Sequence, residues 1–220
     1  MKLKSSILIT VLLIAFSTTV SFAGDQLWTF DSHADSWEVS NGTWGLNDGA
    51  YQLTLGAQAE HSLVGDTGWK NYTVESKVRL DEGNWAGIVV RAKSEMEYLV
   101  YYLNVPNNKT EFWRHKTGGW TARDKVGELA GKNIKIENGK WFEMKVTVDG
   151  DTFSLTIDGE FQGELKDSVY SAGQAGVWGW QTAASFDDFK VSGDDIEGHG
   201  VPVEPQDKAT TTWGNIKGRH

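Results

Sequence analysis

Alternation of apolar and polar residues is the dominant pattern along this chain. In residues 72–80 the two kinds of side chain alternate, so an extended segment would carry its apolar side chains on one face. The same alternation recurs in residues 111–115 and 141–148. Residues 85–91 and 98–104 are instead nearly continuous apolar runs, rich in β-branched and aromatic residues, as in strands buried on both faces. All of these segments predict β-strands.

Turn signals separate the expected strands. Asp149-Gly150-Asp151 follows the 141–148 segment, and Asp158-Gly159 marks a second tight turn, because glycine accepts the positive φ that such turns require. Two further strands are expected at 175–180 and 185–191. About a dozen short strands, and no helical segment long enough for a βαβ unit, predict an all-β sandwich or barrel. We expect one domain over residues 24–192.

The first 23 residues have the pattern of a signal peptide. Lys2 and Lys4 give a positive start, an apolar run follows at 7–16, and Ser21-Phe22-Ala23 offers small residues for cleavage after Ala23. The alternative is a membrane anchor, but a spanning helix needs about 20 apolar residues and this run is shorter. We therefore expect an exported protein, periplasmic or extracellular, with no membrane span after cleavage.

The last 28 residues, 193–220, form an expected linker and tail. The segment begins acidic and glycine-rich and continues with Pro202 and Pro205, a composition typical of a solvated linker. Trp213 and Ile216 then lie one helical turn apart. They indicate either a peg that docks on the domain surface or a sorting or attachment signal.

Charge and cysteine content exclude several functions. The formal net charge of −9 argues against a nucleic-acid partner, because phosphate binding depends on Lys and Arg. A chain without cysteine has no disulfide, no thiolate metal site and no cysteine catalysis. The 11 tryptophans indicate a large aromatic core or exposed rings that stack on ligands. We expect most of them to lie in the core of a monomer, including Trp141, Trp178 and Trp180.

Three segments that together span most of residues 25–192 carry recognisable motifs. They are Gly87-Ile-Val-Val-Arg91 with the strand at 98–104, the hairpin from Lys140 to Gly159, and the closing pair Gly176-Val-Trp-Gly-Trp180 and Phe186-Asp-Asp-Phe-Lys-Val191. They resemble the concanavalin A-like superfamily of laminin-G-like jelly rolls, near the 3-keto-disaccharide hydrolase domains and the carbohydrate-binding modules. The resemblance implies a two-sheet antiparallel jelly-roll sandwich that holds ligands on its concave sheet or at the loops that rim it.

The motifs of related enzymes are incomplete in this chain. Retaining glycoside hydrolysis needs two carboxylates about 5 Å apart, and the Glu-x-Asp-x-(x)-Glu strand of family 16 glycoside hydrolases has no counterpart here. Domains of the 3-keto-disaccharide hydrolase type carry Glu-Trp-Asn at the start of the hairpin strand and Asn-Gly at its turn. The corresponding residues here are Lys140-Trp141-Phe142 and Asp158-Gly159. Catalytic residues therefore stay unassigned, although acids from different strands could still meet.

Sugar binding requires less chemistry than hydrolysis. An apolar sugar face stacks on an aromatic ring, and the hydroxyls pair with Arg, Asp, Glu or Asn. Such side chains occur at strand ends, in loops or along one face of a strand, where each could equally serve core packing or a rim ion pair. The candidate ligand-binding residues are Arg91, Glu111, Trp113, Trp85, Trp120 and Gln181.

A structural calcium ion is the one cofactor considered. Asp187-Asp188 near the last strand and Asp31 near the first resemble the calcium ligands that join terminal strands in many jelly rolls. Calcium takes six to eight oxygen ligands, of which these acids supply a part, and a solvated turn is the simpler alternative. No two histidines have the spacing of a zinc site.

Three functions remain open from the sequence. The first is an exported, lectin-like carbohydrate-binding protein. The second is a glycoside hydrolase-like enzyme of the 3-keto-disaccharide hydrolase type, and the third is an adhesion or scaffold domain that binds another protein. A pair of acids in an open cleft would favour the enzyme, whereas an aromatic face without such a pair would favour sugar binding.

Overall fold

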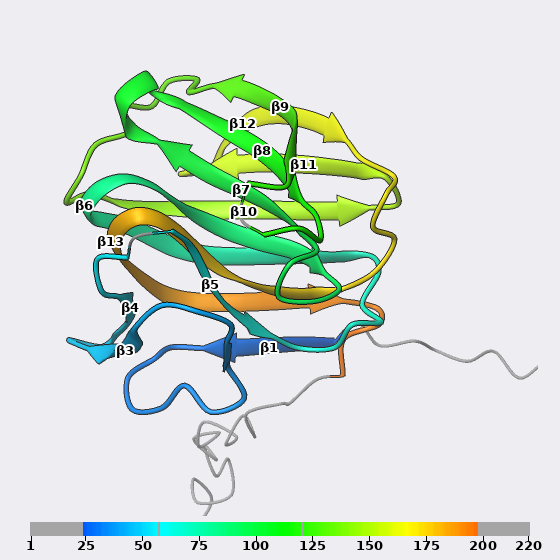
Figure 1. Cartoon of the computed structure of the whole chain (residues 1–220), viewed down its shortest axis with the longest axis horizontal. Helices are drawn as coiled ribbons and strands as arrows, with labels where there is room; N and C mark the ends of the chain where they lie inside the picture. The colour runs from blue at the N-terminus through cyan, green and yellow to red at the C-terminus, as the bar shows by residue number, and fades with distance from the viewer. Residues whose placement is uncertain (1–23, 57, 120, 198–220) are drawn as a thin grey trace, which may run out of the picture.

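A computed structural model describes residues 24–56, 58–119 and 121–197. Within these ranges the protein consists of antiparallel strands and one short 3₁₀ helix (Figure 1). The elements in chain order are β1 (Gly24–Trp28), β2 (Glu38–Val39), β3 (Trp44–Asn47), β4 (Ala50–Leu53), β5 (Ala59–Val64), β6 (Tyr72–Ala92), β7 (Tyr98–Asn104), η1 (Val105–Asn107), β8 (Lys109–His115), β9 (Arg123–Ala130), β10 (Trp141–Asp149), β11 (Thr152–Ile157), β12 (Glu160–Lys166) and β13 (Gln174–Gly193). The all-β prediction is confirmed. The signal peptide and most of the tail, with Trp213 and Ile216, lie outside the described residues.

The strands form a sandwich of two layers (Figure 1). In the first layer, the N-terminal half of β6 and the C-terminal half of β13 pair with each other, and β10, β11, β12, β4, β3 and β1 extend them. In the second layer, the other halves of β6 and β13 pair, flanked by β7, β8 and β9 on one side and β5 and β2 on the other. The two long strands therefore belong to both layers.

Both long strands change layer at a local irregularity. Gly83 has a φ of +97° and lies opposite Thr182, and a Cβ at Gly83 would come within 2.4 Å of the carbonyl oxygen of Gln181. Gln181 itself has a φ of +46°. A residue without a side chain is therefore required where the two strands bend together.

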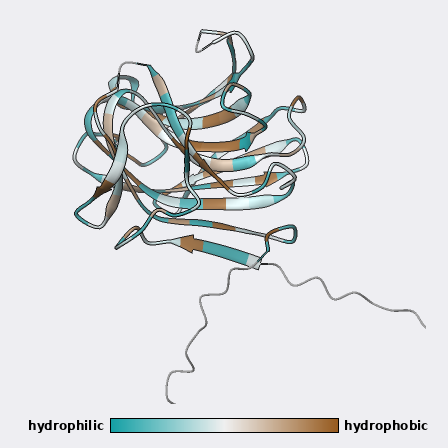
Figure 2. Cartoon of the chain, turned by 60° about the horizontal axis from the view of Figure 1, so that its bottom comes forward, coloured by the Kyte–Doolittle hydropathy of each residue, from teal (hydrophilic) through white to brown (hydrophobic). Residues whose placement is uncertain are grey.

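The core lies between the layers and follows the predicted alternation. In β10, Phe142, Met144, Val146 and Val148 point inward and are fully or almost fully buried. Figure 2 shows apolar stretches along the strands of both layers. Trp141 precedes Phe142 and is therefore on the opposite face of β10, where its partly exposed ring lies under the Arg79 guanidinium at 4.6 Å. The expectation that Trp141 belongs to the core is wrong for this reason.

Candidate functional site

The outer face of the second layer carries a row of side chains that crosses five strands. Glu111 of β8 lies opposite Tyr102 of β7, which lies opposite Gly87 of β6. Gly87 in turn lies opposite Trp178 of β13, and Trp178 lies opposite His61 of β5. Segments that are far apart in the sequence thus bring an acid, two aromatic rings and a histidine onto one surface.

Stacked rings hold the centre of this row. Tyr102 and Trp178 are stacked with ring centroids 5.0 Å apart, and the indole Nε1 of Trp178 donates to the Tyr98 hydroxyl at 3.2 Å. Gly87 sits below the rings, where a Cβ would come within 1.9 Å of the Tyr101 carbonyl oxygen. Trp178 is 1% exposed and belongs to a second apolar cluster on this outer face, apart from the core between the layers.

Glu111 is the best-connected acid on this face. Its carboxylate accepts hydrogen bonds from the Tyr102 hydroxyl at 2.5 Å, from Trp113 Nε1 at 2.8 Å and from Asn104 Nδ2 at 3.3 Å. Two ammonium groups, Lys109 at 3.0 Å and Lys125 at 3.5 Å, lie beside it.

The surroundings of Glu111 decide its charge. Burial alone would raise the pKa of this carboxyl, but the hydrogen bonds from Tyr102, Trp113 and Lys109, together with the charge of Lys125, outweigh burial and lower it to about 2. Glu111 is therefore a permanently ionised acceptor at neutral pH.

An arginine covers the tryptophans next to Glu111. The Arg123 guanidinium lies 5.0 Å from the ring centroid of Trp113 and 4.6 Å from that of Trp180, as in cation–π pairs. Trp180 also stacks on Trp85 at 4.8 Å. These three tryptophans are only partly buried. We call the set Trp85, Tyr102, Glu111, Trp113, Arg123 and Trp180 the aromatic platform.

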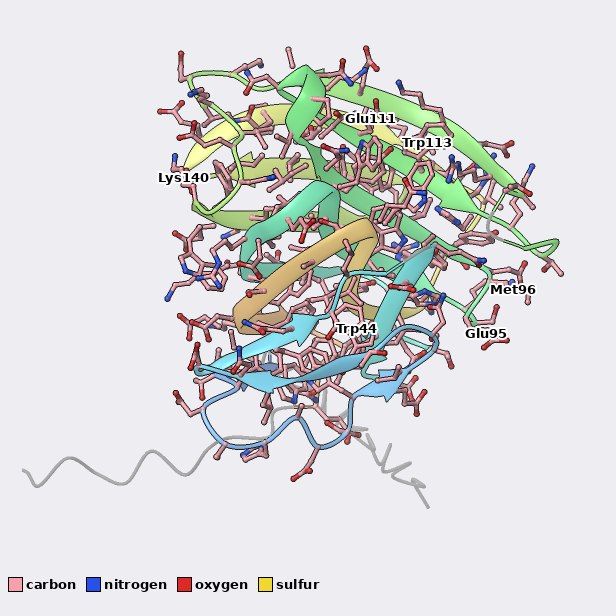
Figure 3. All side chains as sticks on the ribbon, turned by 60° about the vertical axis from the view of Figure 1, so that its left-hand side comes forward. Trp44, Glu95, Met96, Glu111, Trp113 and Lys140 are labelled. Atoms are coloured by element: carbon pink, nitrogen blue, oxygen red, sulfur yellow. The ribbon has the colours of Figure 1, made fainter. Side chains whose placement is uncertain are left out.

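A cleft of about 260 Å³ lies at the β5 end of the row. His61, Tyr98 and His115 line it from below, and Glu95 and Met96 line it from the connection between β6 and β7. The Tyr98 ring contacts both histidines: it stacks on His115 with ring centroids 4.4 Å apart and meets His61 at a tilt, with centroids 4.6 Å apart. In Figure 3, Glu95 and Met96 project from one edge of the layer that carries Glu111 and Trp113. We call this space the histidine cleft.

Both histidines of the cleft are uncharged at neutral pH. Burial lowers the pKa of His61 to about 4, against a small opposing effect of the Glu95 backbone. Burial, and then the charges of Arg123 and His61, lower the pKa of His115 to about 3. A neutral imidazole nitrogen accepts a hydrogen bond, which a protonated one cannot do.

The structure brings some of the predicted ligand-binding residues together and separates others. Glu111, Trp113 and Trp85 meet in the aromatic platform. Gln181 is exposed at the bend of β13, and Trp120 lies outside the described residues.

Arg91 is the clearest departure from the predicted site. It is 2% exposed, and its guanidinium donates to the backbone carbonyls of Lys70 at 3.1 Å, Tyr170 at 2.7 Å and Gly150 at 2.9 Å. At the end of its apolar strand, Arg91 therefore points into the protein and pairs with three backbone carbonyls. Arg91 is a structural residue and we leave it out of the candidate site.

Several residues of this face were missed by the sequence reasoning. Trp180 was assigned to the core, but it is partly exposed, while Tyr102, Arg123, His61 and His115 were not proposed. The alternation within residues 111–115 contained part of the signal, since it places Glu111 and Trp113 on one face, whereas the position of Tyr102 opposite Glu111 depends on the register between β7 and β8. The position of Arg123 over two tryptophans depends on how β9 pairs with β8, which no local pattern reveals.

Comparison with known proteins connects this fold with carbohydrate-active proteins. Residues 25–192 match the family described as the 3-keto-alpha-glucoside-1,2-lyase-like domain. The chain belongs to this family. It is also 23% identical over 161 residues to a levanase of Bacillus subtilis and 27% identical over 150 residues to an extracellular exo-alpha-L-arabinofuranosidase of Streptomyces chartreusis. These matches cover 71% and 63% of this chain, but only 23% and 16% of the two relatives.

Solved structures share the fold. The carbohydrate-binding module CBM66 from Bacillus subtilis matches with a TM-score of 0.63 and 22% identity, over 70% of this chain and 94% of the module. A putative glycosyl hydrolase from Parabacteroides distasonis matches with a TM-score of 0.57 and 12% identity, over 79% of this chain and 94% of that one. The suspected superfamily and the sandwich fold are confirmed. The part of the chain that the structure describes contains no helix long and apolar enough to cross a membrane.

The hairpin residues that differ from the family motif, Lys140-Trp141-Phe142 and Asp158-Gly159, lie away from the aromatic platform. Lys140 pairs with Asp158 at 3.6 Å in the first layer, whereas Glu111 and Trp113 belong to the second (Figure 3). The hairpin residues therefore form their own surface ion pair and do not enter the candidate site.

Glu128 is a second acid close to Glu111 of the aromatic platform. The ammonium of Lys109 lies 3.0 Å from Glu111 and 2.7 Å from Glu128, and Lys125 contacts both carboxylates as well. Hydrogen bonds from Lys109 and then Lys125 lower the pKa of Glu128. Both acids are therefore ionised, and neither resembles the protonated general acid that glycoside hydrolysis requires.

The proposed calcium ligands have a different partner in the structure. The ammonium of Lys77 lies 2.5 Å from Asp188 and 3.8 Å from Asp187. Burial, and the charges of Asp188 and Asp31, raise the pKa of Asp187, against the opposing hydrogen bond from the Asp188 backbone and the charge of Lys77. Among the described residues, no group of three or more His, Cys, Asp or Glu side chains is placed to hold a metal ion. The calcium site with Asp31, Asp187 and Asp188 stays a prediction that this arrangement does not favour.

Proposed function

We propose that this protein is an exported carbohydrate-binding protein that holds a glycan on the aromatic platform. The observation that carries the proposal is the ionised Glu111 carboxylate, which is fixed by Tyr102 and Trp113 beside partly exposed tryptophan rings. A sugar offers the two complementary features, an apolar face for a ring and hydroxyl donors for a carboxylate.

Arg123 gives the platform its second polar partner. Its guanidinium is already oriented by two indole rings. A ligand would therefore lose little additional arginine entropy when it binds there. With the Arg123 guanidinium as donor and the Glu111 carboxylate fixing Tyr102 and Trp113 beside it, the platform presents rings and charged groups together to a ligand.

The charge states of the acids favour binding over hydrolysis. Glu111 and Glu128 share the same two lysines, and both are stabilised as carboxylates. The lyase-like name of the family keeps an enzyme in view, so the product of any binding experiment must be recovered and identified.

The relatives guide the choice of test ligands. The names of the two curated relatives point to levan and to α-L-arabinofuranosides, and that of the family to 3-keto-α-glucosides. Because the chain spans less than a quarter of either relative, these sugars enter as candidates only. Export is supported by the sequence of residues 1–23 and by the word extracellular in the name of one relative.

The test is a glycan array followed by titration of each hit with tryptophan fluorescence as the readout. The panel contains levan, arabinofuranosides, glucans and 3-keto-glucosides, with and without calcium. We expect saturable binding that changes tryptophan emission, with the sugar recovered intact. Glu111→Gln should weaken binding about tenfold, since it removes a charge-assisted acceptor, whereas Glu143→Gln on the other layer should leave it unchanged.

Three results would contradict the proposal. Sugar recovered in cleaved or eliminated form would assign the protein to the enzymes. Equal binding by the Glu111 and Glu143 variants would place the ligand elsewhere. An absence of binding across the panel would favour the adhesion alternative.

A further inference from the structure

We propose that the histidine cleft is a second sugar subsite, in which His61 accepts a hydrogen bond from a hydroxyl group of an uncharged sugar ring. This inference rests on the proposed function, because it assigns to the same ligand a second point of attachment. The histidine cleft differs from the aromatic platform in its chemistry, because it offers a neutral hydrogen-bond acceptor where the platform offers a carboxylate and an arginine.

The first observation is an unsatisfied histidine. His61 is 3% exposed, and neither ring nitrogen has a hydrogen-bond partner of good geometry among the described residues; the Glu95 backbone lies within hydrogen-bonding range of the ring, which raises the pKa of His61 against the larger effect of burial. A buried polar atom without a partner is unfavourable, because it has lost its hydrogen bonds to water and gained none in return. The imidazole lines the histidine cleft, so an incoming hydroxyl group can supply the missing bond from that side.

The neighbours of His61 leave its nitrogens for a ligand. Its backbone N–H donates to Asn41 Oδ1 at 3.1 Å, and the Asn41 amide donates to the Ala59 carbonyl at 2.8 Å. The Tyr98 hydroxyl accepts from Trp178 Nε1 at 3.2 Å and forms no hydrogen bond of good geometry with a ring nitrogen of His61. The strand therefore anchors the histidine through its backbone and through its ring contact with Tyr98.

The charges around the cleft select an uncharged ligand. The groups that face His61 are His115 of β8, Tyr98 of β7 and Glu95 of the connection between β6 and β7, with Arg123 of β9 beyond His115. Both histidines are neutral at pH 7, and Glu95 is the acid at the rim. A sugar acid would find a carboxylate and two uncharged rings there, whereas a neutral sugar finds an acceptor and an aromatic floor.

Size and continuity join the cleft to the platform. A volume of about 260 Å³ suits one sugar ring. His61 and Glu111 are the two ends of one transverse row, four strand spacings apart, which corresponds to roughly 19 Å. An oligosaccharide laid along the row would pass over the Tyr102 and Trp178 region between the two subsites.

The experiment observes the cleft and the platform separately. Nitrogen-15 NMR of the histidine rings, in the wild-type protein at pH 7, reports hydrogen bonding at His61, and tryptophan fluorescence reports the platform. The probes are D-glucose, D-fructose and L-arabinose, with D-glucuronate as the charged counterpart. We expect at least one neutral sugar to shift the His61 acceptor resonance saturably and D-glucuronate to leave it unchanged.

Variants give the second measurement. His61→Phe keeps an aromatic ring against Tyr98 but removes the acceptor, and should weaken binding of the active neutral sugar at the cleft about tenfold. His33→Phe is the same substitution at an exposed position outside the cleft and should have no effect. If the buried His61 variant does not fold, the wild-type NMR titration still decides the matter.

The possible outcomes separate the two proposals. Binding that changes tryptophan emission and leaves the His61 resonance unmoved would overturn the second subsite and preserve the platform. A His61 shift without any tryptophan response would support the cleft and overturn the platform. Failure of all sugars to affect either readout would overturn both, and a shift caused by D-glucuronate would overturn the selectivity for uncharged sugars.

Discussion

The two faces of β8 differ in burial and in chemistry. Phe112 points inward, is completely buried, and stacks on Tyr101 at 4.2 Å and against Phe153 at 4.9 Å. Trp113, the next residue, points outward, is partly exposed and donates to Glu111. Phe112 belongs to the apolar core between the layers, whereas the outer face adds a carboxylate, a cation and neutral histidines to its aromatic rings. Aromatic content alone therefore does not identify a core.

The two arginines repeat the contrast. Arg91 spends its donors on three backbone carbonyls inside the protein, and Arg123 lies across two tryptophans at the surface. From the sequence, Arg91 was the more attractive ligand contact. The structure shows that burial and hydrogen-bond satisfaction, which depend on the tertiary fold, separate the structural arginine from the candidate binding one.

The largest expected effect is a loss of stability that tests the difference between the two faces of β8. Phe112→Ala should lower the free energy of unfolding by about 3–5 kcal/mol, because it removes a fully buried ring and leaves a cavity. Trp113→Ala should cost no more than about 1 kcal/mol, since its ring is partly exposed. Urea denaturation of both variants measures the difference. Similar losses for the two would mean that the outer face is as important to folding as the inner one.

The arginine pair gives the next effect. Arg91→Leu should destabilise the protein by about 3 kcal/mol, because three backbone carbonyls, one of them in a fully buried hydrogen bond, lose their charged donor. Arg123→Leu should change stability little and weaken sugar binding. Thermal unfolding and glycan titration of both variants test this. A stable Arg91 variant that no longer binds sugar would restore Arg91 to the binding site.

Acid should destabilise the protein by protonating residues of the outer face of the second layer. The folded-state pKa values of His61 and His115, about 4 and about 3, lie below the ordinary value of 6.5, so the unfolded chain takes up protons first and stability falls as pH decreases from about 6.5. Each histidine should cost about 2 kcal/mol by pH 4.5. Glu111 adds its loss between pH 4.5 and about 2. Denaturation at a series of pH values should show this slope, and His115→Phe should flatten it. An unchanged slope in that variant would show that other groups control acid sensitivity.

The smallest effect concerns the acids of the first layer. Asp188→Asn should lower stability by less than about 1 kcal/mol, because its partner Lys77 is half exposed. We also expect millimolar calcium to leave the melting temperature unchanged, since Lys77 occupies the space between the two carboxylates. A rise in melting temperature with calcium that Asp188→Asn abolishes would establish the predicted calcium site.

Local patterns predicted the fold better than the site. The alternation in residues 72–80 and 141–148, and the Asp-Gly turns after them, specify strands and hairpins because side-chain period and turn geometry are local properties. Glu111 and Trp113 could be paired for the same reason. The alternation in residues 141–148 also places Trp141 on the face opposite Phe142, so its outward position follows from the pattern, although its apolar side chain suggested the core. The meeting of His61 with His115, and of Arg123 with Trp180, depends on cross-strand registers that only the folded chain determines.

The most direct test of the central claim compares two partly exposed tryptophans on opposite layers. The strongest glycan from the array is titrated calorimetrically into the wild-type protein, Trp113→Ala and Trp141→Ala. The account predicts that Trp113→Ala weakens binding at least about tenfold, since stacking and the support of Glu111 are both lost. Trp141→Ala, which removes a ring that lies under Arg79 on the first layer, should bind as the wild type does. Unchanged binding by the Trp113 variant, or a loss confined to the Trp141 variant, would contradict a sugar site on the outer face of the second layer.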